Sequence, residues 1–260
     1  MEKLPARAGW QWVKQGLQLF RKQPGGLMAL LFICMFSSFF ILLLPVLGQI
    51  VWCVMMPLFS IALLQGCAEV DQGRRAMPHL LLAGVQSPMR KQLLLLGGIN
   101  CLLMVLAMVA IYSLSGDAIN ALREAQAKGA IKPDDVEGLF SGMLAGSAIY
   151  IIGWILMSMT APLIFWQKMA LTKALFFSVV SVLRAVKAFA TAVIVLHLLY
   201  FVGVQLVVLV LGVSSLTIAA IFTLFLISLV LVHCMLYAAY KQMFGTPPAL
   251  PEAVNLNKPF

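Results

Sequence analysis

The chain carries very little charge. Only 10% of its 260 residues are Asp, Glu, Lys or Arg, whereas a soluble globular domain has about 25%. Its mean hydropathy is +1.01, and 62% of its residues are hydrophobic. For the chain as a whole, this composition excludes a soluble enzyme, a disordered protein, a secreted disulfide scaffold and a soluble nucleic-acid-binding protein. It predicts a polytopic membrane protein.

The sequence also lacks the motifs that carry common enzyme chemistry. Its three histidines are far apart and form no HExxH zinc motif, and its five cysteines form no CxxC pair. It has no GxxxxGK[ST] phosphate loop and no GxSxG nucleophile elbow. The 15 methionines are scattered through apolar segments, where methionine is ordinary packing material rather than a copper ligand. We therefore predict a non-enzymatic protein with no catalytic residue, metal or cofactor.

Four long windows of the sequence contain no charged residue. They hold 46, 25, 30 and 53 residues, and they cover positions 23–68, 92–116, 138–167 and 188–240. A membrane helix needs about 20 apolar residues, and turn-forming Pro and Gly residues at 45–48 and 212–215 divide the two longest windows. The predicted fold is all-α, with six transmembrane helices near residues 26–45, 48–67, 93–115, 140–165, 188–211 and 216–239.

The charged residues divide unevenly between the two ends of these spans. Six spans place both termini on one side, and that side holds 15 of the 18 basic residues and four of the nine acidic ones. Its net charge is therefore +11, against −2 on the other side. The positive-inside rule assigns the basic side to the cytoplasm, an N-in/C-in topology. The positive charge is thus an orientation signal rather than a nucleic-acid patch, and no nucleic-acid partner is expected.

Three segments follow from this topology. Residues 1–25 form a cytoplasmic amphipathic segment, 26–240 form the six-helix domain with one sizeable outer loop at 116–139, and 241–260 form a cytoplasmic tail. Within the first segment, an amphipathic helix is predicted over 8–22, with Trp10, Val13, Leu17 and Phe20 on one face. Such a helix lies in the headgroup plane. Lipid sensing, partner docking and simple anchoring of the N-terminus all remain open.

Nine residues are candidates for contact with lipid headgroups or a partner protein. They combine interfacial tryptophans with basic residues at the cytoplasmic ends of the spans: Trp10, Trp12, Lys14, Arg74, Arg75, Arg90, Lys91, Arg184 and Lys187. Cytoplasmic Lys and Arg side chains attract the anionic headgroups of the bilayer. A membrane-protein partner or a second copy of the chain is the alternative.

A glycine pattern stands at the outer end of the fourth span. Gly138, Gly142 and Gly146 form GxxxGxxxG, and Gly153 follows one heptad after the last of them. Small residues at this spacing allow two helices to approach closely. The pattern predicts helix packing, either within the chain or between two copies of it.

Two polar residues in the fifth span define a second function class. His197 and Gln205 are eight residues apart, so they share one helix face and could line a polar path for a solute. Alternatively, each hydrogen-bonds a neighbouring helix. The spans lack Asp, Glu, Lys and Arg, and this argues against ion-coupled transport.

Several short motifs carry a resemblance to a known family. They are GWQWVKQG at 9–16, LFRKQP at 19–24, LPVLG at 44–48 and the stretch from Pro162 to Arg184. With these motifs, and over most of its length, the chain resembles the uncharacterised BPSS-type inner-membrane proteins of beta-proteobacteria. The resemblance implies a multi-pass protein of the bacterial inner membrane. It leaves the function open, because that family has no established activity.

Two functional hypotheses remain after these observations. The first is a non-enzymatic envelope protein that binds lipid or a partner through its basic cytoplasmic segments. The alternative is a permease or exporter for a small amphipathic or neutral solute, with His197 and Gln205 in its path.

Overall fold

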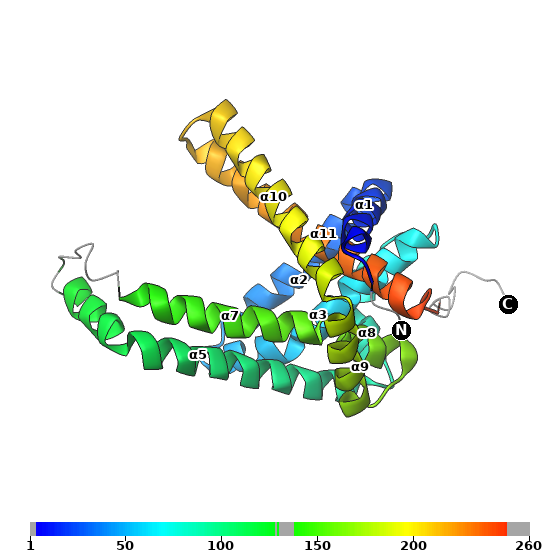
Figure 1. Ribbon diagram of the computed structural model, residues 1–260, viewed down its shortest axis with the longest axis horizontal. Helices are drawn as coiled ribbons and strands as arrows, with labels where there is room; N and C mark the ends of the chain where they lie inside the picture. Colours follow the sequence, from blue (N-terminus) through cyan, green and yellow to red (C-terminus); the bar gives the residue numbers. More distant parts are fainter. Residues whose placement is uncertain (1–3, 128, 130–137, 249–260) are drawn as a thin grey trace.

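Six helices long and apolar enough to cross a membrane dominate the fold (Figure 1). The computed structural model describes residues 4–127, 129 and 138–248, and within these ranges all regular structure is helical. The spans are α2 (Pro24–Leu42), α3 (Leu47–Asp71), α5 (Arg90–Ala127), α7 with α8 (Leu139–Met157 and Thr160–Gln167), α10 (Val186–Leu211) and α11 (Ser215–Phe244). The predicted all-α fold with six spans is confirmed.

The remaining elements gather at one end of the molecule. They are α1 (Ala6–Lys22), η1 (Pro78–Leu82), α4 (Ala83–Gln86) and α9 (Leu171–Arg184). Together with α8, the C-terminal parts of α3 and α11 and the first turns of α5 and α10, they form what we call the basic end (Figure 1). This is the end that the positive-inside rule assigns to the cytoplasm.

Two hairpins project from the basic end in different directions (Figure 1). We call them the α5–α7 arm and the α10–α11 arm. The turn of the second arm was predicted at 212–215, and Gly212 there adopts a φ of +62°, which suits glycine because it has no Cβ. Ser214 then caps α11, since its Oγ accepts a hydrogen bond from the Thr217 N–H at 3.2 Å.

Two spans differ from their predicted form. The third continues to Ala127, beyond the predicted end at 115, because the chain bends at Ser115 (φ −133°, ψ 16°) and resumes as a helix. The fourth is broken between α7 and α8, at Ser158 and Met159. Pro162 lies in the first turn of α8 and has no N–H to donate to the carbonyl of Ser158, four residues earlier.

Buried side chains concentrate at the basic end. Every residue of α3 from Ile61 to Val70 is buried, and so is every residue of α11 from Cys234 to Tyr240. In contrast, no residue of α10 after Ala192 is buried. The core of the protein therefore lies at the basic end, and the arms present most of their apolar side chains to the bilayer.

Candidate functional site at the basic end

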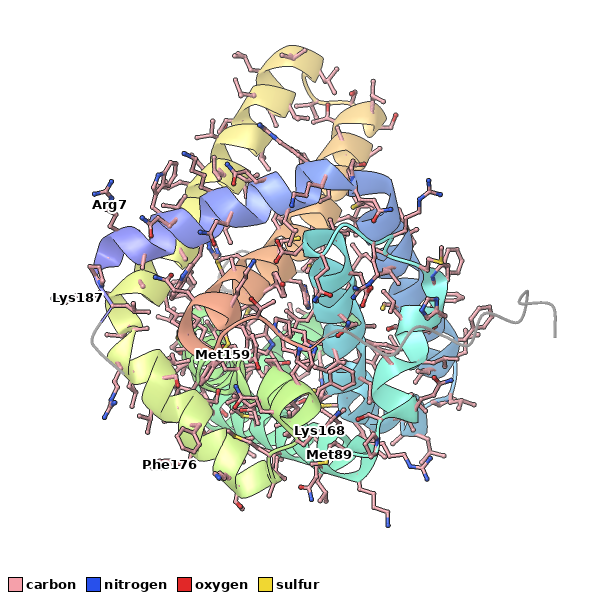
Figure 2. The ribbon with its side chains drawn as sticks, turned by 90° about the vertical axis from the view of Figure 1, so that its right-hand side faces the viewer. Arg7, Met89, Met159, Lys168, Phe176 and Lys187 are labelled. Atoms are coloured by element: carbon pink, nitrogen blue, oxygen red, sulfur yellow. The ribbon has the colours of Figure 1, made fainter. Side chains whose placement is uncertain are left out.

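Helix α1 lies across the basic end, over α10 and α11 (Figure 2). Trp12 holds it there. Its side chain is fully buried, its ring meets that of Phe189 edge-on at 5.1 Å, and its Nε1–H donates to Oε1 of Gln242. A single tryptophan thus ties α1 to both helices of the last hairpin.

Two glycines bring the backbone of α1 directly onto these helices. A Cβ added to Gly9 would lie 2.9 Å from the backbone nitrogen of Ala192 in α10, and one added to Gly16 would lie 3.0 Å from that of Met235 in α11. At Gly9 a Cβ would also overlap the carbonyl oxygen of Ala188, which leaves no room for a side chain, and at Gly16 a Cβ would require the backbone of α11 to shift. Gly9 and Gly16 are one heptad apart, so they lie on the same face of α1 as the buried Trp12.

The buried face of α1 differs from the predicted apolar face. It consists of Ala8, Gly9, Trp12, Val13, Gly16 and Leu19. Trp10, which was predicted to share a face with Val13, is instead 51% exposed. The glycines determine this rotation of the helix, because only their side allows backbone contact. The prediction that Trp12 contacts lipid or a partner protein is contradicted by its complete burial, whereas Trp10 is accessible.

Only two acidic residues lie at the described part of the basic end, and both bind groups of this chain. Oδ2 of Asp71 accepts hydrogen bonds from the Lys241 ammonium at 2.6 Å and from the Tyr237 hydroxyl at 2.9 Å. Glu69 forms an ion pair with Arg74 and accepts a bond from Gln65 at 2.7 Å. These bonds fix the end of α3 against α11 and against the loop that follows α3.

A buried polar chain that the sequence did not single out continues from Glu69 into the core. Gln65 is fully buried, and its Oε1 accepts a hydrogen bond from the Trp166 indole N–H at 2.8 Å. Gln65 therefore links α3 to α8. The signal that could have indicated it is its spacing of four residues from Glu69 on one helix.

The predicted basic residues come from separate segments, and the structure places them at one end. Six of them are exposed there: Lys14, Arg75, Arg90, Lys91, Arg184 and Lys187. Figure 2 shows Arg7 and Lys187 on this surface as well. Arg74 differs, because its guanidinium is paired with Glu69. The two described acids are already engaged, so the surface keeps a large positive excess.

Lys168 also lies at this end but is held in place locally. Its ammonium donates to the carbonyl of Phe165 at 2.8 Å and stands 5.1 Å from the centre of the Phe165 ring. Partial burial lowers the pKa of its side chain, because removal from water disfavours the charged form.

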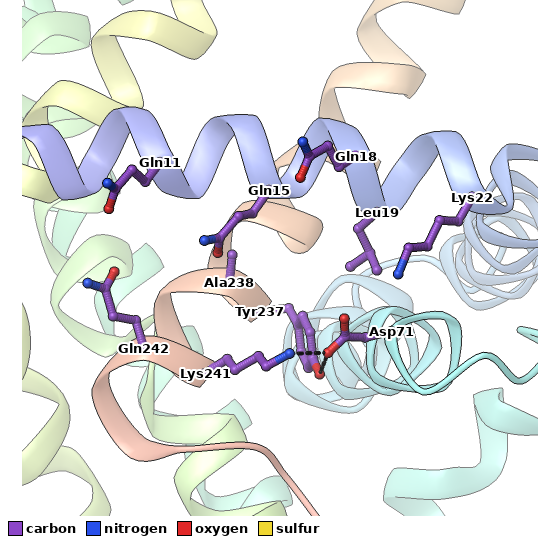
Figure 3. A pocket seen from close by; sticks show the side chains of 10 residues that line it. All are labelled: Gln11, Gln15, Gln18, Leu19, Lys22, Asp71, Tyr237, Ala238, Lys241 and Gln242. Atoms are coloured by element: carbon purple, nitrogen blue, oxygen red, sulfur yellow. Dashed lines mark hydrogen bonds and ion pairs between the residues drawn. The ribbon is translucent and has the colours of Figure 1, made fainter.

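A cavity of about 440 Å³ opens between α1 and α11 (Figure 3). We call it the α1–α11 groove. Its α1 wall carries Gln11, Gln15, Gln18 and Lys22, and the facing wall carries Asp71, Tyr237, Lys241 and Gln242. The groove carries polar side chains on both walls, with Leu19 and Ala238 between them, and it lies on the same end as the exposed basic residues.

The four glycines of the predicted packing pattern contact α5 within the same chain. A Cβ on Gly142 would lie 2.7 Å from the carbonyl oxygen of Ile111, and one on Gly146 would lie 2.8 Å from that of Ala107. Gly138 and Gly153 face α5 in the same way, at 2.8 Å from Ala118 and 2.6 Å from Leu103. The glycines hold the α5–α7 arm together.

The two residues of the predicted polar path lie on the α10–α11 arm. His197 and Gln205 are both exposed, and Nδ1 of His197 lies 2.9 Å from the carbonyl oxygen of Val193 in its own helix. Neither residue lines the α1–α11 groove or the smaller cavity beside the bend in α5.

Comparison with known proteins gives one relative that covers the whole architecture. The chain is similar to a "Probable inner membrane protein" of Burkholderia thailandensis, to which it is 28% identical over 271 residues, an alignment that covers 96% of each chain. No family model matches the chain, and no solved structure matches it. With the six apolar helices, this relative confirms the resemblance to beta-proteobacterial inner-membrane proteins. The chain is a multi-pass protein of that membrane.

Proposed function

From this multi-pass inner-membrane architecture, we propose that the protein is non-enzymatic and binds anionic phospholipid headgroups with its basic end, on the cytoplasmic side of the membrane. The observation that carries the proposal is the uncompensated positive charge there. Lys14, Arg75, Arg90 and Lys91 are exposed, whereas the described acids are occupied by groups of the chain itself.

The magnitude of this attraction is sufficient for lipid selection. Each Lys or Arg near an anionic membrane surface contributes about 1 kcal/mol, so several such residues on one end enrich anionic lipid strongly around the protein. Trp10 is exposed among them, and tryptophan favours the headgroup level of a bilayer. The side chains also stand on a packed core, so little ordering is needed when lipid binds.

The test uses the full-length protein in nanodiscs of mixed phosphatidylcholine and phosphatidylglycerol. The lipid retained by the protein after gentle detergent extraction is quantified by mass spectrometry. We expect phosphatidylglycerol to be enriched over its bulk fraction, and we expect high salt to reduce the enrichment. Bulk composition around the wild-type protein would overturn the proposal.

A charge-reversed variant locates the effect. Arg75→Glu combined with Arg90→Glu and Lys91→Glu should abolish most of the enrichment. Arg123→Glu is the matched control, because Arg123 is exposed on the described part of α5 beyond the bend, away from the basic end. The proposed orientation is tested separately, by a reporter at the C-terminus that fluoresces only in the cytoplasm.

A further inference from the structure

The α1–α11 groove is built differently from the rest of the basic surface. Helix α1 has two polar stripes. The outer stripe carries Arg7, Lys14 and Arg21, each one heptad apart, whereas the groove stripe carries Gln11, Gln15 and Gln18 and ends with Lys22. A face that only needed to meet water or a charged membrane could carry Lys and Arg throughout. Three neutral amides in a row instead supply both hydrogen-bond donors and acceptors.

The facing wall adds further hydrogen-bonding groups. Because the Trp12 indole donates to Oε1 of Gln242, the amide nitrogen of Gln242 keeps both of its N–H donors. Asp71 holds the Tyr237 hydroxyl and the Lys241 ammonium through Oδ2. Its carboxylate can therefore still accept a hydrogen bond from a ligand hydroxyl. Figure 3 shows Gln15 and Lys22 pointing from α1 into this space, whereas Lys241 and Tyr237 of α11 point toward Asp71.

One cation in the groove is available for an anion. Within the described part of the chain, Lys22 makes no hydrogen bond or ion pair, and it lies within electrostatic reach of Asp71. Lys241 is partly neutralised by Asp71. Two lysines and one carboxylate give the groove a net charge of +1, enough for one phosphate but not for a polyanion.

We propose that the α1–α11 groove binds one phosphorylated polyol, a phosphoglycerol group in its smallest form. Lys22 pairs with the phosphate, while the glutamine amides and Asp71 bind the hydroxyls. The volume of about 440 Å³ lies within the range of about 300–1,000 Å³ that small-molecule sites occupy. The phosphoglycerol group is carried by phosphatidylglycerol or is free in the cytoplasm as glycerol phosphate. For the lipid source, the inference rests on the proposed function.

The experiment titrates full-length protein in phosphatidylcholine nanodiscs with glycerol phosphate, by calorimetry. In parallel, native mass spectrometry counts the lipids retained from nanodiscs doped with phosphatidylglycerol or with phosphatidylserine, which has the same net charge. We expect one site per chain that prefers phosphoglycerol. Saturable binding of glycerol phosphate identifies the free source. A single retained phosphatidylglycerol that glycerol phosphate does not displace identifies the lipid.

Two variants probe the two halves of the recognition. Lys22→Ala removes the phosphate partner, and Gln15→Leu with Gln18→Leu removes hydroxyl partners without a change of charge. Each should weaken binding about ten- to a hundredfold. Arg123→Ala is the control, because it removes the same charge at an exposed position outside both the groove and the basic end, and it should change binding less than about twofold. Gln15→Glu, which adds repulsion at an exposed position, provides a second test that leaves the packing intact.

The outcomes separate this inference from the proposed function. Equal retention of phosphatidylserine and phosphatidylglycerol, or binding unaffected by the Lys22 and glutamine variants, overturns the groove proposal. The general enrichment that depends on Arg75, Arg90 and Lys91 would survive that result. Conversely, glycerol phosphate binding without enrichment of any anionic lipid overturns the proposed function and leaves the groove proposal standing.

Discussion

The basic end and the two arms share apolar, membrane-spanning helices, yet they are packed differently. In α3, every residue from Ile61 to Val70 is covered by the protein, whereas α10 has no covered residue from Val193 to Leu211. In a bilayer, apolar side chains gain little by leaving lipid for another helix. Close packing therefore requires contacts other than hydrophobic ones, and the basic end contains such contacts.

Two kinds of contact make the difference. At the basic end, Gly9 and Gly16 allow backbone approach, and buried hydrogen bonds through Gln65 join helices that are distant in sequence. The α5–α7 arm has glycine contacts and the hydrogen bonds of Ser115, whose Oγ donates to the carbonyl of Gly138 and accepts from the Gly142 N–H. They join helices that follow one another along the chain. The comparison indicates that polar bonds between distant segments fix the basic end as a platform, whereas the α5–α7 arm has such bonds beside the bend at Ser115 and otherwise relies on glycine contacts.

Replacing Trp12, which anchors α1 to α10 and α11, should cause the largest loss of unfolding free energy. Trp12→Ala leaves a cavity and an unpaired Gln242, and we expect it to cost about 3–5 kcal/mol of unfolding free energy. The measurement is a denaturing-detergent titration in mixed micelles. Trp10→Ala, two residues away and exposed, should cost less than about 1 kcal/mol. Equal losses would show that α1 is not seated through Trp12.

Next in size is the loss of the buried glutamine. Gln65→Leu leaves the Trp166 indole N–H unpaired and removes a donor to Glu69, and it should cost about 2–3 kcal/mol. The same substitution at Gln49, which is exposed in the other half of the same helix, should change stability by less than about 0.5 kcal/mol. A comparable cost at both positions would remove the contrast between the buried C-terminal half of α3 and its exposed N-terminal half.

A methyl group added inside an arm should cost less than either. Gly142→Ala places a Cβ against the carbonyl oxygen of Ile111, and overpacking of this kind costs about 1–3 kcal/mol, the lower half being expected for a two-helix contact. Gly98→Ala is the control, since a Cβ there meets no atom within 4 Å. That control should be neutral, or more stable by up to about 1 kcal/mol through helix propensity. A neutral Gly142→Ala would mean that the arm is not held by close contact.

The smallest effect is expected on the outer surface of α10. His197→Leu with Gln205→Leu should change unfolding free energy by less than about 0.5 kcal/mol, because both side chains are exposed. Anionic lipid enrichment should also be unchanged. A solute flux in proteoliposomes that these two substitutions abolish would instead support the permease alternative.

The spans could be predicted because their limits are set by charges and turns. The fifth was expected at 188–211 and is found at Val186–Leu211, with Lys187 in its first turn and Gly212 directly after its end. The third was placed correctly at its start but extended beyond its expected end. A bend such as the one at Ser115 and a loop have the same sequence pattern, because both interrupt an apolar run before charged residues.

The candidate site could be predicted only in part. The distribution of charge was enough to predict that the basic residues lie at one end. The face that α1 buries, however, contains two glycines and an alanine, and hydrophobic periodicity does not indicate such a face. The α1–α11 groove requires Trp12 to meet Gln242, 230 residues away. No local pattern specifies such a partner, and in a membrane the protein-facing and lipid-facing sides of a helix are equally apolar.

The packing of α1 on α10 and α11 also implies an order of assembly. A ribosome makes α1 before α10 and α11, the helices on which it rests. Gly9 therefore has no surface to meet until Ala192 has been translated, and Gly16 has none until Met235 has been translated. Until then α1 can lie only at the headgroup level of the bilayer, with Trp12 in the membrane interface. Its docking therefore follows the synthesis of most of the last hairpin. A chain truncated before α10 would keep its first four spans but would lack the helices against which the glycine face of α1 packs.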